Sequence, residues 1–111
     1  MDRMRRLRAS ETLRSMVREN HVRVEELIYP VFVTACTDIR HPVASMPGIC
    51  QYSIDRLGEE LDRVVAAGVS SVLLFGIPEC KDAVGSGAYD ENGIIQQAVR
   101  WIKKEEKYSR L

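Results

Sequence analysis

The chain has 111 residues, of which 45% are hydrophobic and 29% charged, and its formal net charge is +0. These values argue against a disordered or multidomain protein, and they give no reason to expect nucleic acid or an anionic membrane as a partner. Because no apolar run is long enough to span a bilayer or to act as a secretory signal, we expect a single cytoplasmic domain.

The first 23 residues are strongly basic. They contain three acidic residues and seven arginines. The arginines are Arg3, Arg5, Arg6, Arg8, Arg14, Arg18 and Arg23. The acids argue against an organelle transit peptide, and the lack of aromatic residues argues against an arm that stacks on nucleic acid. Two interpretations remain open: an arm that grips another subunit, and a solvated arginine-rich helix face.

One short helix is predicted within this basic arm. Ser10 is a suitable N-cap, and the helix should end near Asn20. Its apolar face would consist of Leu13, Met16 and Val17.

An apolar, β-rich run, LIYPVFV, covers residues 27–33 and predicts the first strand. Pro30 within it requires an edge position or a strand start, because proline lacks a backbone N–H. Residues 34–52 contain two prolines and one glycine, which exclude a regular helix. We expect ordered irregular chain there, anchored by Ile39, Val43, Met46 and Ile49.

Residues 53–68 predict the second helix, with Ser53 as N-cap and Gly68 as the C-terminal glycine. Its expected core face is Leu57, Leu61, Val64 and Val65. The next apolar run, SVLLF at residues 71–75, lacks alternation, as is typical of a parallel strand covered on both faces. A long polar loop leads to a last helix whose core face would be Ile94, Ile95, Ala98 and Ile102.

This order of strand, helix, strand and helix is typical of right-handed βαβ units in an α/β fold. Two such units bury too little apolar surface and leave strand edges open. A TIM barrel needs eight strands and roughly 250 residues. We therefore expect the chain to be the opening quarter of something larger.

Three cysteines, Cys36, Cys50 and Cys80, are widely spaced and form no CxxC or CxC pair. Since His21 and His41 do not lie at ligand-like offsets, no metal site built by this chain is expected. The cysteines are expected to be free and mostly buried thiols in a reducing compartment. Both histidines are expected to be structural or surface residues.

The loop over residues 76–93 is polar and rich in glycine. Its GSG sequence at residues 85–87 lacks the lysine of a P-loop and the spacing of a dinucleotide-binding loop, so it does not predict a phosphate cradle. Asp82, Asp90 and Glu91 are separated along the loop, and such carboxylates are more often solvated than paired for acid–base chemistry.

Several segments of the chain occur together in a recognisable order: RRLR near the start, LIYPVFV, SMPGI, the helix over residues 53–68, SVLLFG and GSGAYDENGIIQQAVR. In this order and spacing they resemble the porphobilinogen synthase (5-aminolevulinate dehydratase) family. The resemblance extends from about Arg5 to about Lys104, nearly the whole chain.

The resemblance implies a hydro-lyase that condenses two 5-aminolevulinate molecules to porphobilinogen in tetrapyrrole (heme) biosynthesis. It further implies two Schiff-base lysines, zinc or magnesium as cofactor, and a TIM barrel whose N-terminal arm wraps a neighbouring subunit, commonly in a homo-octamer. The chain would then be the truncated opening βαβα part of the barrel at residues 27–104. A helical arm at residues 1–26 would precede it, and a divergent charged tail at residues 105–111 would follow.

The resemblance assigns no catalytic residue and no metal ligand to this chain, because the family's lysines and zinc cysteines lie on later strands. Phe75 resembles a position that lines the substrate pocket, although simple core packing is the alternative. Gly76 would end the strand at the rim where TIM barrels place active sites. The residues that resemble the subunit-contacting arm are Arg5, Arg6 and Arg8.

Three functions are consistent with these observations. The first is an N-terminal fragment of porphobilinogen synthase that is inactive by itself. The second is a short interaction protein that docks its arginine-rich arm onto full-length subunits, and the least supported is a nucleic-acid-binding arm. We also expect the chain alone to be poorly folded or self-associating, because helix faces such as Leu57, Leu61 and Val65 would lack a sheet to cover them.

Overall fold

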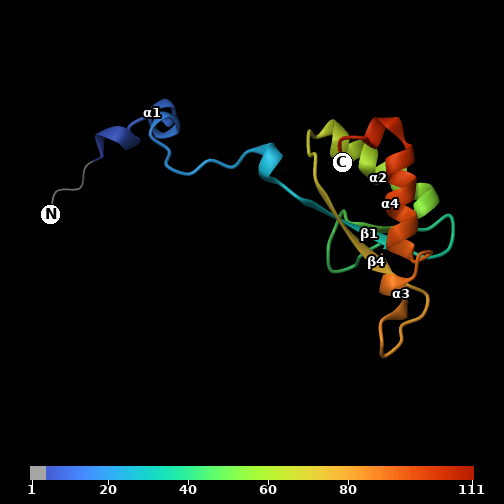
Figure 1. Cartoon of the computed structure of the whole chain (residues 1–111). Helices are drawn as coiled ribbons and strands as arrows, with labels where there is room; N and C mark the ends of the chain where they lie inside the picture. The colour runs from blue at the N-terminus through green and yellow to red at the C-terminus, as the bar shows by residue number, and fades with distance from the viewer. Residues whose placement is uncertain (1–4) are drawn as a thin grey trace.

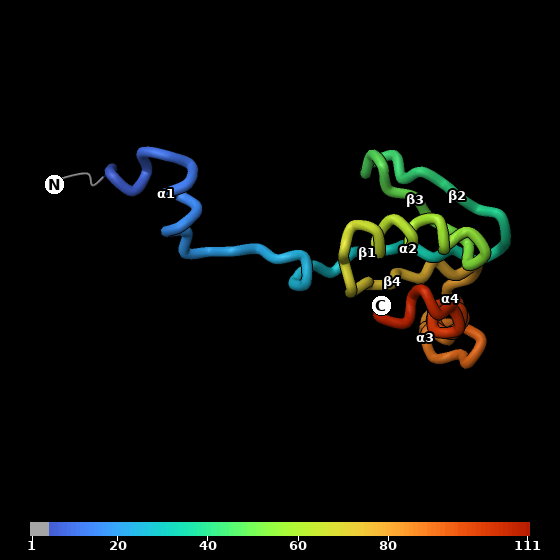
Figure 2. Tube along the Cα trace, turned by 90° about the horizontal axis from the view of Figure 1, so that it is seen from above, coloured from blue at the N-terminus to red at the C-terminus, as the bar shows by residue number. Residues whose placement is uncertain are grey.

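A computed structural model describes residues 5–111, so Asp2 and Arg3 of the basic arm lie outside the described residues. An α/β body carries an N-terminal arm that projects far from it (Figure 1). The radius of gyration is 20.1 Å, compared with about 13 Å for a compact domain of this length. The arm accounts for this difference, because the strands and the longer helices lie together at the other end of the molecule (Figure 2).

The arm contains a 3-10 turn at Arg6–Arg8 and the short helix α1 at Glu11–Met16. The Ser10 hydroxyl accepts a hydrogen bond from the Leu13 N–H at 3.2 Å, which confirms the predicted N-cap. The helix ends at Met16, before the predicted Asn20. Its apolar side chains are exposed, and an unpacked helix this short gains little stability from length.

Four strands form one sheet in the order β2-β3-β1-β4. Their bounds are β1 Tyr29–Thr34, β2 Arg40–Pro42, β3 Cys50–Ser53 and β4 Val72–Ile77. β1 is parallel to both β3 and β4, and β2 is antiparallel to β3. The predicted parallel strand pair is therefore confirmed as β1 and β4.

Pro30 lies at the start of β1, as predicted. The Tyr29 N–H donates to the Ser71 carbonyl at 2.9 Å, on the β4 side. The N–H position of the next residue, Pro30, faces β3. Pairing between β1 and β3 begins only at Phe32. The missing N–H of Pro30 therefore removes no hydrogen bond from the sheet.

Two strands that were not predicted from the sequence, β2 and β3, lie within residues 40–53. β2 and β3 form a hairpin whose closing segment includes Gly48 at φ +85°, a conformation that favours glycine. The exclusion of a regular helix is confirmed, but the expectation of irregular chain throughout was wrong. The strands have three and four residues, too few for a clear alternation pattern, and pairing with β1 holds β3 in place.

The helices α2 (Leu57–Ala66) and α4 (Ile94–Lys104) cover one face of the sheet (Figure 1). The core between them and the sheet comprises Val31, Val33, Tyr52, Leu57, Leu61, Ala98, Ile102 and Tyr108. The expectation that the α2 face would lack a sheet was wrong, because four strands rather than two are present. Val65 is the exception and is 42% exposed. Within residues 5–111, no helix combines the length and apolar character needed to cross a membrane.

The two ends of the second predicted helix compare differently with the prediction. Ser53 ends β3 and occupies the predicted N-cap position, at the start of a 3-10 turn at Ile54–Arg56 that leads into α2. Its hydroxyl makes no capping hydrogen bond, because it accepts from the Ile39 N–H at 2.8 Å. Gly68 takes φ +83° just after the helix, which confirms it as the C-terminal glycine.

The face of the sheet opposite the helices is apolar and bare. Leu73 and Phe75 on β4 are 51% and 45% exposed. Phe32 of β1 stacks on Phe75 with ring centroids 5.5 Å apart. The predicted covering of β4 on both faces was therefore wrong for the described chain, because α2 and α4 both lie on the other face.

The charged tail folds back onto the helices. It contains a 3-10 turn at Glu106–Tyr108, and Tyr108 is 1% exposed. The Tyr108 hydroxyl donates to the Asp62 carboxylate at 2.5 Å and lies 3.2 Å from the Gly58 carbonyl oxygen. Residues 105–111 therefore contribute a side chain to the core.

Candidate functional site

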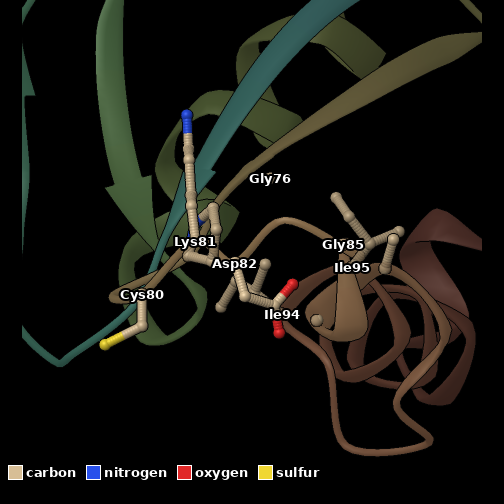
Figure 3. Close-up of a pocket in the computed structure, with 10 residues that line it drawn as sticks. Gly76, Cys80, Lys81, Asp82, Gly85, Ile94 and Ile95 are labelled. Atoms are coloured by element: carbon tan, nitrogen blue, oxygen red, sulfur yellow. The ribbon is translucent and has the colours of Figure 1, made fainter.

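The carboxyl ends of β1 and β4 meet at one rim of the sheet, where parallel α/β folds place their ligand sites. The loop after β4 forms a hollow of about 210 Å³ there with the start of α4 (Figure 3). A second hollow of about 600 Å³ also takes in residues 35–37, which follow β1. This rim is the candidate functional site.

Gly76 sets how closely α4 approaches β4 at this rim. A Cβ added to Gly76 would lie 2.8 Å from side-chain carbons of both Ile94 and Ile95. Because that separation is shorter than van der Waals contact, a larger residue would push the start of α4 away from the strand. Glycine at this position therefore shapes the floor of the smaller hollow.

Asp82 organises the loop that forms one wall of this hollow. Its carboxylate accepts hydrogen bonds from the Ser86 N–H at 2.9 Å and from the Ser86 hydroxyl, at the start of the short helix α3 (Ser86–Tyr89). These bonds hold the pKa of Asp82 below its usual range. The Ser86 N–H is thus already bonded to a carboxylate.

Lys81 is the lysine nearest the hollow, and it is exposed. Figure 3 shows its side chain extending away from Asp82 and Ile94. Lysines that attack carbonyl groups are activated by desolvation or by a neighbouring cation. Lys81 lacks the enclosure that such chemistry requires.

The cysteines are free, as predicted, but the expectation that most of them are buried was wrong. Cys36 and Cys80 are exposed and Cys50 is half-buried, because the first two lie in rim loops rather than in strands. The Cys36 thiol donates to the Glu79 carboxylate at 3.1 Å. This hydrogen bond, together with the nearby negative charge, raises the pKa of Cys36.

Phe75 lies on the bare face of the sheet and lines neither hollow. With 45% of its surface exposed, it is not part of the buried core of the described chain. Its proposed role in lining a substrate pocket stays a prediction.

The arm, which carries Arg5, Arg6 and Arg8, projects away from the rim (Figure 1). Arg5, Arg6 and Arg8 are exposed, and none of the ion pairs within residues 5–111 involves them. Their guanidinium groups thus have no ion-pair partner within the described chain. Their contact with another subunit stays a prediction.

Residues 5–111 contain no group of three or more His, Cys, Asp or Glu side chains that could hold a metal ion. Zinc sites in proteins are built from several such ligands, and magnesium sites rely on carboxylates. The zinc or magnesium that the resemblance implies therefore does not fit the donor groups of the described residues.

Residues 35–37 and Asp55 also contribute to the rim, which was not predicted from the sequence. The larger hollow includes all of them. One signal was available: chain segments that follow neighbouring parallel strands emerge at the same rim. The segment after β1 could therefore have been paired with the loop after β4.

A family model described as delta-aminolevulinic acid dehydratase matches residues 1–110. The delta-aminolevulinic acid dehydratase of Staphylococcus epidermidis is 50% identical over 102 residues, which are 92% of this chain and 32% of that protein. The Staphylococcus aureus enzyme is 50% identical over 103 residues, covering 93% of this chain and 32% of the relative.

A similar solved structure is the delta-aminolevulinic acid dehydratase (porphobilinogen synthase) of Toxoplasma gondii ME49 in complex with the reaction product porphobilinogen. It superposes with a TM-score of 0.84 at 30% sequence identity, covering 94% of this chain and 30% of that one. The chain thus spans about a third of the length of the relatives that it matches.

Proposed function

Because the chain belongs to the delta-aminolevulinic acid dehydratase family, we propose that it supplies the opening strand–helix units of a porphobilinogen synthase barrel. The complete enzyme would condense two molecules of 5-aminolevulinate to porphobilinogen in tetrapyrrole biosynthesis. Since the chain spans 32% of its bacterial relatives and its rim holds no enclosed lysine, we propose that it is inactive by itself.

The observation that carries this proposal is the one-sided sheet. In a TIM barrel the helices cover the outer face of the strands, while side chains on the inner face fill the barrel interior. Phe32, Leu73 and Phe75 occupy the face without helices, and β4 pairs with a strand on one edge. Further strands joined at the β4 edge would bury these side chains.

Groups beyond the rim would also serve the complete enzyme. Phe75 would face the substrate, and the arm with Arg5, Arg6 and Arg8 would contact a neighbouring subunit of a cytoplasmic homo-oligomer. A zinc or magnesium ion would be held by residues other than those described, because these offer no suitable donor group.

A second candidate function is docking onto full-length subunits without catalysis. The feature that favours it is the arm, whose apolar side chains have no cover. Leu7, Met16 and Val22 are 57%, 77% and 81% exposed. Exposed apolar side chains alongside arginines are typical of surfaces that bind other proteins.

Complementation tests the enzyme proposal. The chain is assayed for porphobilinogen formation alone and co-expressed with the part of the Staphylococcus aureus relative that this chain does not cover. We expect no product from the chain alone and measurable product from the pair. Phe75→Asp should abolish the paired activity, whereas Val84→Asp, at a 72% exposed loop position, should leave it intact.

Product from the chain alone would refute its proposed inactivity, and no product from a co-purifying pair would refute its role in the barrel. Docking is tested separately by co-purification with the full-length Staphylococcus aureus relative. Arg5→Ala/Arg6→Ala should weaken that co-purification, and the matched pair Lys104→Ala/Arg110→Ala should not.

A further inference from the structure

The two exposed cysteines follow neighbouring parallel strands. Cys36 comes just after β1, and Cys80 comes just after β4. Pairing of the two segments continues past the strand ends, since the Ala35 N–H donates to the Ile77 carbonyl at 3.3 Å. The two cysteines therefore emerge at the same rim of the sheet.

The Cys36 side chain already spans the gap between the two segments. Its sulfur lies 3.1 Å from an oxygen of Glu79, the residue before Cys80. Cys36 and Cys80 both line the hollow of about 600 Å³. Cys80 also lines the smaller hollow, and Figure 3 shows its sulfur directed away from Ile94 and Asp82.

We propose that Cys36 and Cys80 are a dithiol modification site that reacts with low-molecular-weight disulfides to form a reversible intramolecular disulfide. The bond would join the chain after β1 to the chain after β4 and so close the rim. Both residues are free thiols in the structure.

The reaction balances as two thiol–disulfide exchanges. The thiolate of one cysteine attacks a sulfur of the external disulfide, forms a mixed disulfide and releases one external thiolate. The second cysteine gives its proton to solvent, and its thiolate attacks the protein sulfur of the mixed disulfide and releases the other external thiolate. Two protein thiols are oxidised, and one external disulfide is reduced to two thiols.

The geometry needs only a local change. A disulfide requires Cα atoms roughly 4.4–6.8 Å apart, and paired strands are about 4.8 Å apart. Because the hydrogen bond of Cys36 is to Glu79, the residue before Cys80, the exposed loop after Pro78 would shift locally to bring the two sulfur atoms together. No core residue lies in this part of the loop.

Glu79 controls the reactivity of the pair. Its hydrogen bond and negative charge raise the pKa of Cys36, so they lower the fraction of the reactive thiolate at neutral pH. Glu79→Gln removes the charge while keeping the size of the side chain. This variant should therefore react faster at Cys36.

Two alternatives to this pair are less well supported: a metal site at the rim, and a disulfide that includes Cys50. A metal site needs further ligands, and residues 5–111 offer no group of three. Cys50 is half-buried at the first residue of β3, the opposite end of a strand parallel to β1, so it lies away from the rim. Cys50 serves as an internal control.

The test exposes the complete chain to oxidised glutathione, in native buffer and in denaturant, and maps disulfides by mass spectrometry without reduction. Cys36 and Cys80 are the most distant pair in sequence, so loop-closure entropy disfavours their bond in an unfolded chain. We expect the Cys36–Cys80 bond to dominate in native buffer and to be the minority bond in denaturant. Equal distributions in the two conditions would overturn the proposal.

Variants make the test specific. Cys50→Ser should leave the bond intact, whereas Cys36→Ser and Cys80→Ser should each leave a glutathione adduct on the remaining rim cysteine. Glu79→Gln should speed alkylation of Cys36 by iodoacetamide several-fold relative to the unchanged chain. Glutathione adducts on both rim cysteines with no internal disulfide would overturn the pairing, and an unchanged alkylation rate would overturn the role of Glu79.

Discussion

At the scale of single residues, the buried carboxylate of Glu60 on α2 is the group that most needs hydrogen-bond partners. It is 4% exposed, and an unpartnered buried charge is very unfavourable. It accepts hydrogen bonds from the hydroxyls of Tyr29 at 2.6 Å and Tyr52 at 3.1 Å, and Arg63 pairs with it at 2.9 Å. Glu60 therefore ties α2 to β1 and β3.

This contact predicts an unusual alkaline titration. The hydrogen bond to Glu60 and, to a smaller extent, burial raise the pKa of Tyr29 from 10.0 to about 12. Because the folded-state pKa is the higher one, the stabilisation is complete below pH 10 and is lost as pH rises towards about 12. Tyrosinate absorbance should show a step near pH 12 that Tyr29→Phe removes.

The control for this titration is Tyr89→Phe, which changes a 69% exposed tyrosine and should keep the step. Retention of the step in Tyr29→Phe would show that the high-pH group is a different tyrosine.

At the scale of elements, the packing of α4 on β4 depends on the absence of a side chain at Gly76. Ile94 and Ile95 fill the space above it. The charged tail is a second such contact, because Tyr108 inserts beside Gly58 and Asp62 on α2. Both contacts join segments that are distant in sequence.

Gly76→Ala should lower the free energy of unfolding by about 1–3 kcal/mol, because the added methyl group overlaps two isoleucine side chains. Gly87→Ala is the matched control, since a Cβ there meets nothing within 4 Å. In a helix such as α3 it should be neutral or stabilise by about 0.5 kcal/mol. Urea denaturation midpoints measure both changes, and equal effects would refute the packing argument.

Replacing Tyr108 tests whether the tail belongs to the folded unit. Tyr108→Phe removes its hydroxyl bonds and should cost about 1 kcal/mol, whereas Tyr108→Ala leaves a cavity and should cost about 3 kcal/mol or more. Lys107→Ala breaks a solvent-exposed ion pair with Asp62 and should shift the urea midpoint less than Tyr108→Phe, because solvent screens exposed ion pairs. If Tyr108→Ala unfolds at the same urea concentration as the unchanged chain, the tail does not contribute to the core.

At the scale of the whole molecule, the body has one covered and one bare sheet face. The bare face carries Phe32, Leu73 and Phe75 beside the open edge of β4. Uncovered apolar strands with an open edge promote association. The expected self-association thus has a different source from the one predicted from sequence, which was the helix faces.

Sedimentation velocity over a range of concentrations tests this surface. The unchanged chain should sediment faster as its concentration rises, and Leu73→Lys should weaken this dependence by placing a charge on the bare face. Val84→Lys, at an exposed apolar position in the loop, should behave like the unchanged chain. A monomer at all concentrations would refute the prediction.

Features that depend on local patterns and on family motifs could be predicted from the amino-acid sequence alone. The sequence indicated the strands over residues 27–33 and 71–75, the core face of α4, the core face of α2 except for Val65, the caps at Ser10 and Gly68, and the family. It did not reveal β3, because a four-residue strand is defined by its partner rather than by its own pattern.

Which side chains meet across the chain became apparent only from the folded structure. Glu60 looks like a solvent-facing helix residue until Tyr29 and Tyr52 are placed around it, and Tyr108 looks like part of a charged tail until α2 lies beside it. The same holds for Cys36, whose neighbour Glu79 comes from another strand end. Burial and hydrogen bonding depend on such long-range pairings, and local periodicity carries no information about them.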